Sequence, residues 1–393
     1  MAWLGLDDTD SLDGGCTTEM FVRLLERMGV EYDDPRLVRL WPFAENRTRG
    51  NAAVAANLKI SFDEAVNLVE EHWIWLCERS EPDSNPGMVL TEEQLDESIY
   101  WNAVRMHVES TDIDTPIRHH LWSTGGTGVI GATAAIAWRG IQDHTWENTV
   151  YRSAENIGSP RRIDENSIAE MDKKFPGTFL NRDPRKQKGL IAPRSPCPVL
   201  LGIRGETEDD VRSAFEWLRN NGDMEEVAGN MVWRTNQACD DHIGSVITAT
   251  VETTPVVRTN GHASASTSEG DIVAFSEGGD VNKLLQGLIP GDVISWLGLE
   301  HLGVYHLERL RLVKAALRFK QRPMCHCGKR MKSAGKGQSP RCPTCGTQSE
   351  VDWIGEHIEP SEWMEPAPDR RRHLAAPLER KIPKDDIDLK SHI

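Results

Sequence analysis

The sequence lacks the features of a secreted or membrane protein. No apolar run approaches the roughly 18 residues that cross a membrane, and the acidic start has neither the basic nor the apolar region of a signal peptide. Eight cysteines in 393 residues are too few for a disulfide scaffold. With 38% hydrophobic and 27% charged residues, the chain is typical of a globular protein of about two to four domains. We expect it in the cytoplasm.

Basic residues are outnumbered by acidic ones, 45 Lys and Arg against 61 Asp and Glu, so the formal net charge is −16. This argues at first against a nucleic-acid partner. The distribution of charge reverses that argument, because residues 307–341 carry eleven Lys or Arg and one acid, which gives +10 there and leaves −26 for the remainder. One basic segment on an acidic body is compatible with local nucleic-acid contact. An acidic, halotolerant proteome would give the same body charge without functional meaning.

An acidic loop near the N-terminus carries the clearest chemistry. A short apolar strand over residues 3–6 precedes it, and two glycines and an amphipathic helix follow it. The carboxylates of this stretch and the two threonines that open the helix are Asp7, Asp8, Asp10, Asp13, Thr17 and Thr18. Carboxylates at a strand end suit Mg²⁺ on a triphosphate, and free N–H groups at a helix start favour anions. The alternative is a solvated acidic turn with a threonine N-cap.

Two further segments place glycine before a regular element. Residues 49–51 stand at a strand start and are able to contact a phosphate, although a bare Arg-Gly-Asn is more typical of a turn. Residues 123–131 precede a helix, where small residues let backbone N–H groups approach an anion, yet they match neither a Walker loop nor a dinucleotide fingerprint. The candidate ATP-binding residues are Arg49, Gly50, Asn51, Gly125, Gly126 and Gly128. Together with the acidic loop, they predict an α/β domain with a nucleotide cleft over residues 1–140.

Two different textures follow in the middle of the chain. Residues 141–238 alternate short strands and helices, which is typical of a ferredoxin-like α+β domain; Cys197 in one strand is expected to be a core residue. The polar run 235–242 favours either contact with a substrate amine or RNA, or a hinge. Residues 239–320 read as all-β and predict an OB-fold barrel, a common platform for single-stranded nucleic acid. An SH3-like barrel would give similar signals.

Four cysteines form the strongest single motif, within residues 321–350. Two pairs, each ending in Cys-Gly, suit a closed tetrahedral zinc site in a small ribbon. The predicted ligands are Cys325, Cys327, Cys342 and Cys345, and the candidate RNA-binding residues between the pairs are Lys329, Arg330, Lys332 and Lys336. The first pair is one residue shorter than usual, so His326 is an alternative ligand. Residues 351–393 have little periodicity, and we expect a loosely ordered tail.

Taken together, these segments resemble the archaeal tRNA-Ile 2-agmatinylcytidine synthetases, the TiaS family, over roughly residues 3–350. The shared motifs stand in the same order: GLDDTDS from residue 5, CTT from 16, RGN from 49, NPG from 85, PCPV from 196, GIRG from 202, TNQ from 235 and KRMKSAGKG from 329. Two departures are the short first zinc pair and Ala238-Cys239, where Gly-Thr is expected after Thr-Asn-Gln.

The resemblance implies a multidomain α+β protein with a kinase-like α/β domain, a ferredoxin-like domain, an OB-fold β-barrel and a zinc ribbon, which is the order expected from the residues. It further implies an ATP-dependent ligase. The family attaches agmatine to C2 of the wobble cytidine of an isoleucine tRNA with anticodon CAU, so that the anticodon reads AUA.

The residues suit that reaction. The C2 oxygen of cytosine is a poor leaving group, and phosphorylation makes it departable so that agmatine attacks C2. We expect Asp7, Asp8 and Asp10 to position Mg²⁺ and ATP. By resemblance, Thr17 is the phosphorylated hydroxyl, and Thr18 is the adjacent alternative. The agmatine dication needs an acidic pocket, for which the candidates are Asp183, Asp240 and Asp241.

Two other functions compete with this one. A non-catalytic protein that grips single-stranded nucleic acid would use the barrel and the ribbon, but would leave the acidic loop and both glycine-rich segments without a role. A kinase of another small substrate would leave the barrel and the ribbon idle. Formation of AMP only when tRNA and agmatine are both present distinguishes the three.

Overall fold

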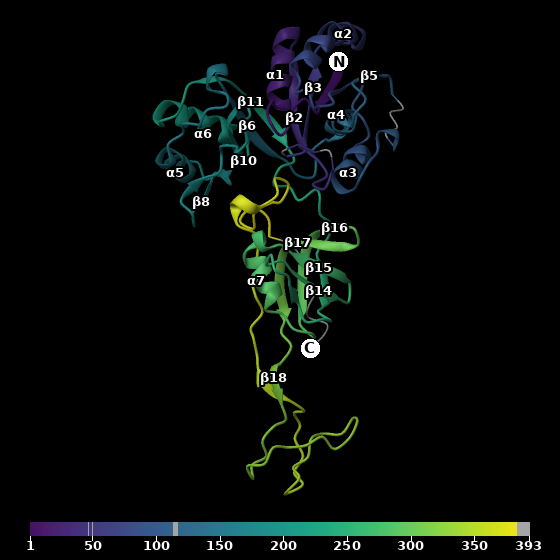
Figure 1. Cartoon of the computed structure of the whole chain (residues 1–393), viewed down its shortest axis with the longest axis vertical. Coiled ribbons are helices and arrows are strands. Elements are labelled where there is room, and N and C mark those ends of the chain that lie inside the picture. The colour runs from purple at the N-terminus through teal and green to yellow at the C-terminus, as the bar shows by residue number, and fades with distance from the viewer. Residues whose placement is uncertain (46, 49, 113–116, 383–393) are drawn as a thin grey trace. The chain divides into compact units, whose positions relative to one another are not determined.

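The structure is a computed structural model that describes residues 1–45, 47–48, 50–112 and 117–382. Within these residues the chain forms two compact units, which we treat separately. The first unit comprises residues 1–243 and 367–382, and the second comprises residues 244–366. The prediction of a multidomain protein with helices and several sheets is confirmed (Figure 1). No helix in the described part of the chain is long and apolar enough to cross a membrane.

A nine-stranded sheet runs through the first unit in the order β5-β4-β1-β3-β2-β11-β6-β10-β7. Its strands are β1 (Ala2–Asp7), β2 (Tyr32–Arg39), β3 (Ala52–Leu58), β4 (Gly87–Thr91), β5 (His119–Ser123), β6 (Thr145–Arg152), β7 (Thr178–Phe179), β10 (Val199–Gly205) and β11 (Val227–Thr235). Neighbouring strands pair antiparallel except β2 and β11, which are parallel over two residue pairs. A small ladder, β8 (Arg182–Asp183) with β9 (Lys188–Gly189), lies apart from this sheet.

Helices bury both faces of the first part of the sheet. The helices of the unit are α1 (Thr17–Met28), α2 (Phe62–Arg79), α3 (Glu97–Arg105), α4 (Gly128–Ala137), α5 (Glu165–Lys174) and α6 (Glu208–Asn221). Along β3, Val54 and Ala56 join the core under α1 and α2, whereas Ala53 and Ala55 join the core under α3 and α4. This alternation follows from the two-residue period of a strand. A third core packs α5 and α6 on β6 and β10.

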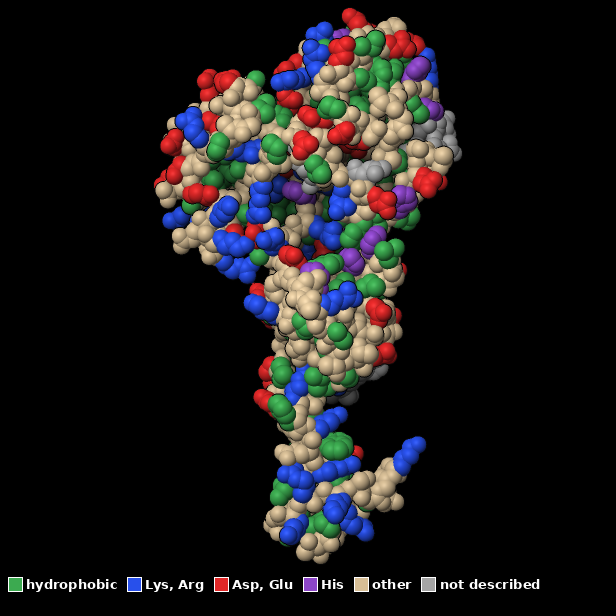
Figure 2. Space-filling model, in the orientation of Figure 1, with side chains coloured by type: hydrophobic (Ala, Val, Ile, Leu, Met, Phe, Trp, Pro, Cys, Tyr) green, Lys and Arg blue, Asp and Glu red, His purple; other side chains and the backbone are tan. Residues whose placement is uncertain are grey.

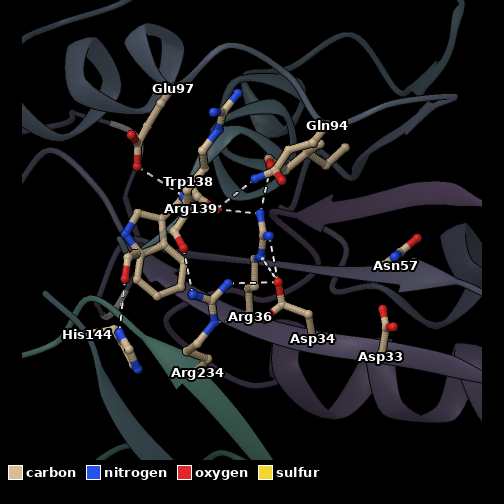
Figure 3. Close-up of polar contacts among 12 residues, drawn as sticks. Asp33, Asp34, Arg36, Asn57, Gln94, Glu97, Trp138, Arg139, His144 and Arg234 are labelled. Carbon is tan, nitrogen blue, oxygen red and sulfur yellow. Dashed lines mark hydrogen bonds and ion pairs between the residues drawn. The ribbon is translucent and has the colours of Figure 1, made fainter. Parts of the chain in front are cut away.

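An ion-pair network reinforces the short parallel junction of β2 and β11 (Figure 3). Asp34 accepts hydrogen bonds from Arg36 Nη2 at 2.6 Å and from Arg234 Nη2 at 2.7 Å. Arg36 also donates to the carbonyls of Ile136 and Trp138 at the end of α4, where a cation complements the helix dipole. The network therefore ties the two halves of the sheet together and fixes the C-terminal end of α4.

The second unit contains a six-stranded sheet in the order β12-β16-β17-β15-β14-β13. The elements are β12 (Ile247–Thr250), β13 (Val256–Val257), β14 (Ala263–Thr267), β15 (Gly270–Ala274), α7 (Asp280–Gln286), β16 (Val293–His301) and β17 (Val304–Lys314). The strand order is linear, so the described ladders do not close into the barrel that we expected. An isolated bridge between Val251 and Thr267 brings the end of β12 toward β14. The ribbon follows between β18 (Arg318–Gln321) and β19 (Ile354–Glu356), which pair antiparallel.

The end of the chain corrects our expectation of a loosely ordered tail. Residues 367–382, which we call the C-terminal strap, belong to the first unit. There Leu374 and Ala376 are almost completely buried, and Arg380 forms ion pairs of 2.8 Å with Asp143 and Glu206. The strap contains only a single 3₁₀ turn of regular structure, so periodicity gives no sign of it. Residues 383–393 lie outside the described part of the chain.

Candidate active site

A cavity of about 870 Å³ opens in the first unit. Its walls come from the β1–α1 loop, β2 and the loop after it, β6, β10 and the C-terminal strap. Seven predicted site residues line it, namely Asp7, Asp8, Asp10, Thr17, Thr18, Gly50 and Asn51. Six others lie outside the lining, namely Gly125, Gly126, Gly128, Asp183, Asp240 and Asp241. Arg49 is outside the described residues.

The acidic loop concentrates carboxylates that resist ionisation. Asp8 has φ of 59°, a left-handed conformation that Asp tolerates, and its N–H donates to Asp7 Oδ1 at 2.7 Å. Burial, and next the charge of Asp8, raise the pKa of Asp7 well above its usual value; burial likewise raises the pKa of Asp8. Ionisation of these neighbouring, buried carboxylates is unfavourable in the absence of a cation. A hard divalent cation bound by their oxygens would favour the ionised form.

The two threonines after this loop face different partners. Thr17 Oγ1 accepts a hydrogen bond from the Thr9 hydroxyl at 3.2 Å and from the Thr9 N–H at 3.4 Å. Thr18 Oγ1 lies 3.0 Å from Cys16 Sγ. The helix begins at Thr17 and its N-cap residue is Cys16, which makes no side-chain capping bond. The alternative of a threonine N-cap is therefore wrong, and both hydroxyls are left at the edge of the cavity.

Close packing accounts for the glycines around the start of α4. A Cβ at Gly126 would collide with Asn85, and one at Gly128 would lie 2.6 Å from the Gly87 nitrogen, while Gly125 has φ of 104°. These positions need glycine whether or not an anion binds. A Cβ at Gly131 would collide with the Asp7 carboxylate, so this glycine gives Asp7 its place in the cavity.

A second wall of the cavity is basic and was not predicted. Its core is Arg39 from β2, Glu147 from β6, Arg204 from β10 and His373 from the strap. Arg204 Nε lies 3.2 Å from Glu147 Oε2, and Arg204 Nη2 lies 3.4 Å from His373 Nδ1. Burial opposes the ionisation of Glu147, but Arg204 and Arg39 outweigh it and hold its pKa low. Arg39, then burial and Arg204, hold the pKa of His373 well below its usual value, so the imidazole is neutral.

Two residues of the polar run that follows β11, Asn236 and Gln237, form hydrogen bonds with the residues of this wall. Asn236 Oδ1 accepts from the Arg39 N–H and its Nδ2 donates to the Arg39 carbonyl, both at 2.8 Å. Gln237 Nε2 donates to Glu147, and its Oε1 accepts from Arg204 Nε at 3.1 Å. Both amides are completely buried. The Thr-Asn-Gln motif, together with the GIRG motif that contains Arg204, was thus a sequence signal for the basic wall, although the partners of these residues cannot be read from the sequence.

The three carboxylates predicted for agmatine are already engaged elsewhere. Asp241 Oδ2 accepts from the Tyr100 hydroxyl at 2.5 Å, and Asp240 Oδ1 accepts from the Ala376 N–H at 2.8 Å. Asp183 is buried at the β8–β9 turn, where its Oδ1 accepts from the Arg185 N–H at 3.0 Å. Its Oδ2 has no hydrogen-bond partner among the described residues, although Lys186 Nζ approaches it to 3.7 Å. These placements make Asp240 and Asp241 part of the scaffold of the first unit.

The ribbon cysteines converge in the second unit. The sulfur atoms of Cys325, Cys327, Cys342 and Cys345 all lie within 4.8 Å of one another. Four sulfurs about 2.3 Å from a common centre fit zinc, and among the described residues His326 is not part of this group. The four basic residues predicted to contact RNA are exposed between the two pairs. Figure 2 shows Lys and Arg side chains gathered over the ribbon.

Family models match three stretches of the chain: the TiaS TCKD domain at residues 3–61, the TiaS FLD domain at residues 126–242 and the TiaS C-terminal zinc ribbon domain at residues 322–358. The tRNA 2-agmatinylcytidine synthetase TiaS of Cenarchaeum symbiosum (strain A) is 34% identical, over 96% of this chain and 92% of that protein. The chain belongs to the TiaS family. The resemblance inferred from the motifs is confirmed.

Solved structures of TiaS share this fold. The crystal structure of TiaS in complex with its isoleucine tRNA and ATP superposes with a TM-score of 0.78 at 30% identity, over 98% of this chain and 99% of that chain. The crystal structure of TiaS with the same tRNA, AMPCPP and agmatine gives a TM-score of 0.77 at 27% identity, over 98% of both chains. The likeness to TiaS therefore extends over nearly the whole length of the chain, both units included.

Proposed function

We infer that this protein is an ATP-dependent 2-agmatinylcytidine synthetase that acts on an isoleucine tRNA. It joins agmatine to C2 of the wobble cytidine of that tRNA and thereby enables AUA decoding. The observation that carries this function is the match to TiaS over nearly the whole of both chains. The cavity supports it, because carboxylates, threonine hydroxyls and arginines meet there as phosphoryl transfer requires.

The chemistry exchanges an oxygen for a nitrogen at C2 of cytosine. A phosphoryl group that originates from ATP is transferred to the C2 oxygen. This step forms an O–P bond and breaks the bond between phosphorus and the oxygen that carried it, which belongs either to ATP or to a threonine phosphorylated by ATP. The primary amine of agmatine then attacks C2 and loses a proton. The C2–O bond breaks with its electron pair, and the oxygen departs on phosphate.

The acidic loop is assigned to the ATP-dependent steps. Asp7, Asp8 and Asp10 would hold Mg²⁺, a hard cation that suits buried carboxylates and neutralises triphosphate charge. Thr17 is the hydroxyl phosphorylated during ATP cleavage, and Thr18 is the alternative. The donors from Thr9 support Thr17, because they stabilise negative charge on its Oγ1. Residues 49–51 and the start of α4 complete the proposed ATP site.

The remaining parts of the chain are assigned to domains and partners. Residues 1–140 form the kinase-like domain, residues 141–238 the ferredoxin-like domain and residues 239–320 the OB fold; residues 321–350 form the zinc ribbon and residues 351–393 the C-terminal segment. Exposed Lys329, Arg330, Lys332 and Lys336 bind tRNA phosphates.

The eight cysteines all lie in the described part of the chain and form no disulfide, which suits the reducing cytoplasm. Asp183, Asp240 and Asp241 remain the proposed agmatine residues, and binding through them requires a rearrangement of their present contacts.

Mass spectrometry of the wobble cytidine tests the function. An isoleucine tRNA transcript is incubated with the protein, Mg-ATP and agmatine, and we expect a mass gain of agmatine minus water. The absence of this gain under conditions where tRNA still binds would favour a binding protein or a different amine donor.

Threonine variants test the nucleophile in the same assay. We expect Thr17→Ala to abolish product formation and to leave tRNA binding intact, because it removes the phosphorylated oxygen. Thr18→Ala is the matched control one residue away, and it should retain at least about a tenth of the rate. Full turnover by Thr17→Ala would rule out its role, and loss in Thr18→Ala alone would move the role to Thr18.

A further inference from the structure

Arg39 of the basic wall lies near the acidic loop. It is the last residue of β2 and lines the cavity. Its Nη1 donates to the Gly50 carbonyl at 3.3 Å, whereas its Nε is buried and has no hydrogen-bond partner in the described part of the chain. Asp10 and Cys16, which precede Thr17 in the chain, both lie close enough to Arg39 to affect the ionisation of its guanidinium. Arg39 therefore presents an unsatisfied N–H donor and a positive charge at the wall of the cavity. An anionic ligand would satisfy both.

The fold builds a specific seat for this side chain. A Cβ at Gly50 would collide with Arg39 Nη1, so glycine at this position leaves the space that the guanidinium occupies. Asn236 clamps the Arg39 backbone on both its N–H and its carbonyl. Asn236 is fixed in turn by the Tyr100 hydroxyl at 2.7 Å, which donates to Asp241. A buried chain of hydrogen bonds therefore holds Arg39 from a strand that lies almost 200 residues away in sequence.

Neighbouring charges leave Arg39 available to a ligand. Two partly buried arginines, Arg39 and Arg204, share one buried carboxylate, Glu147. His373 adds no charge, because it is held neutral and its Nδ1 accepts from Arg204. Glu147 is further engaged by Gln237 and by the Thr149 hydroxyl at 3.0 Å. Within the basic wall, two arginines and one carboxylate leave a net positive charge, and a cation that is withdrawn from water is stabilised by an anion.

We propose that Arg39 is a catalytic residue that binds the phosphoryl group during its transfer from ATP. This deepens the proposed function and rests on it. In the transfer to threonine, a bond forms between Oγ and phosphorus, the bond from phosphorus to the nucleotide oxygen breaks, and that oxygen keeps the electron pair. The hydroxyl proton passes to a carboxylate of the acidic loop. The planar guanidinium donates to the non-bridging oxygens, where charge accumulates. Asn236 holds the backbone of Arg39 in place for this contact.

Arg39→Ala, Arg39→Gln and Arg39→Lys test this role in the full chain with tRNA, Mg-ATP and saturating agmatine. We expect Arg39→Ala and Arg39→Gln to lower kcat about 10³-fold and Arg39→Lys about 10²-fold, because Lys lacks the planar fork. The KM for ATP and the binding of tRNA should change by less than about fivefold. Added ethylguanidinium should restore at least about tenfold of the Arg39→Ala rate and should not accelerate the wild type.

Arg152→Ala provides the matched control. Arg152 is a buried arginine of β6 that does not line the cavity, and its donors bind Glu225, Ser159 and Pro160. We expect this variant to lose thermal stability, to keep its rate per folded molecule within about threefold, and to gain nothing from ethylguanidinium.

Three results separate the possible failures. If wild type forms no product, the proposed function is overturned before Arg39 is tested. If wild type forms product and Arg39→Ala or Arg39→Gln keeps kcat within threefold, the catalytic role of Arg39 is overturned. The same holds if both variants lose stability as Arg152→Ala does and guanidinium restores no activity. Arg39→Gln keeps the length of the side chain, so it reports on the role even if Arg39→Ala does not fold.

Discussion

The two walls of the cavity differ in how the chain builds them. The acidic wall, formed by Asp7, Asp8, Asp10, Thr17 and Thr18, comes from one continuous stretch between β1 and α1. The basic wall, formed by Arg39, Glu147, Arg204 and His373, comes from three strands and the C-terminal strap. One wall is a local motif that a strand and a helix present together. The other exists only when segments more than 300 residues apart fold against each other.

The difference shows what kind of chemistry each wall supports. The acidic wall gathers like charges, so it is stable only with a cation or with protons, which is why the pKa values of Asp7 and Asp8 are raised. The basic wall contains its own counter-charge in Glu147 and a set of buried amides that fix its geometry. We interpret the acidic wall as the part that binds exchangeable ligands. In the function that we propose, the basic wall is the part against which the reacting phosphate is placed.

Asp8→Asn tests the acidic wall and carries the largest expected effect. Asn tolerates the left-handed backbone of this position, so the loop is kept while one carboxylate is lost. We expect the rate of product formation to fall about 10³-fold, equivalent to about 4 kcal/mol of transition-state stabilisation. The rate is measured by mass spectrometry of the modified tRNA.

Asp13→Asn is the control for this variant, because Asp13 is exposed in the same loop and does not line the cavity. It should change the rate by less than about twofold. An equal loss in both variants would show that the charge of the loop matters rather than the position of Asp8.

Asp241→Asn tests the scaffold behind the basic wall through the pH dependence of the free energy of unfolding. Burial raises the pKa of Asp241 from 3.8 to about 6, against the opposing effects of the Tyr100 hydrogen bond and Lys381; Asp143 and His242 also face it. Between pH 4 and pH 6 the folded state holds a proton that the unfolded chain has lost. Stability therefore falls as pH rises through this window, by up to about 3 kcal/mol, and Asp241→Asn removes this fall.

Thermal denaturation of both proteins from pH 4 to pH 7 measures this effect. The stability of wild type relative to Asp241→Asn should decrease with rising pH and level off above pH 6. Two denaturation curves that stay parallel across the range would contradict the buried, protonated state of Asp241.

Gly50→Ala displaces the basic wall with the smallest expected effect. The added Cβ collides with Arg39 Nη1, which is the end of a flexible side chain, so the guanidinium shifts while the fold is kept. We expect a loss of about 30-fold in kcat with a melting temperature within about 2 °C of wild type. Gly229→Ala is the control, because a Cβ there meets nothing within 4 Å. A Gly50→Ala protein with full kcat would show that the position of Arg39 is not important.

Much of the fold was predictable because its signals are local. The helix after the acidic loop begins at Thr17, and Phe21, Leu24 and Leu25 are buried on one face, as their spacing indicates. The zinc cysteines converge because each pair is held by a short turn of its own. The strap was missed for the opposite reason. It has almost no regular structure, and its order comes from buried residues and from the ion pairs of Arg380.

The sequence by itself determined the acidic wall, since residues that are neighbours in the chain remain neighbours after folding. It also contained Thr-Asn-Gln, but it did not show which residues this motif contacts. Tertiary structure decided those contacts, because it places β2 beside β11 and β11 beside β6. In that order Asn236 meets Arg39, and Gln237 meets Glu147 and Arg204. No local periodicity encodes such pairs, because hydrogen bonds between distant buried residues depend on the strand order of the whole sheet.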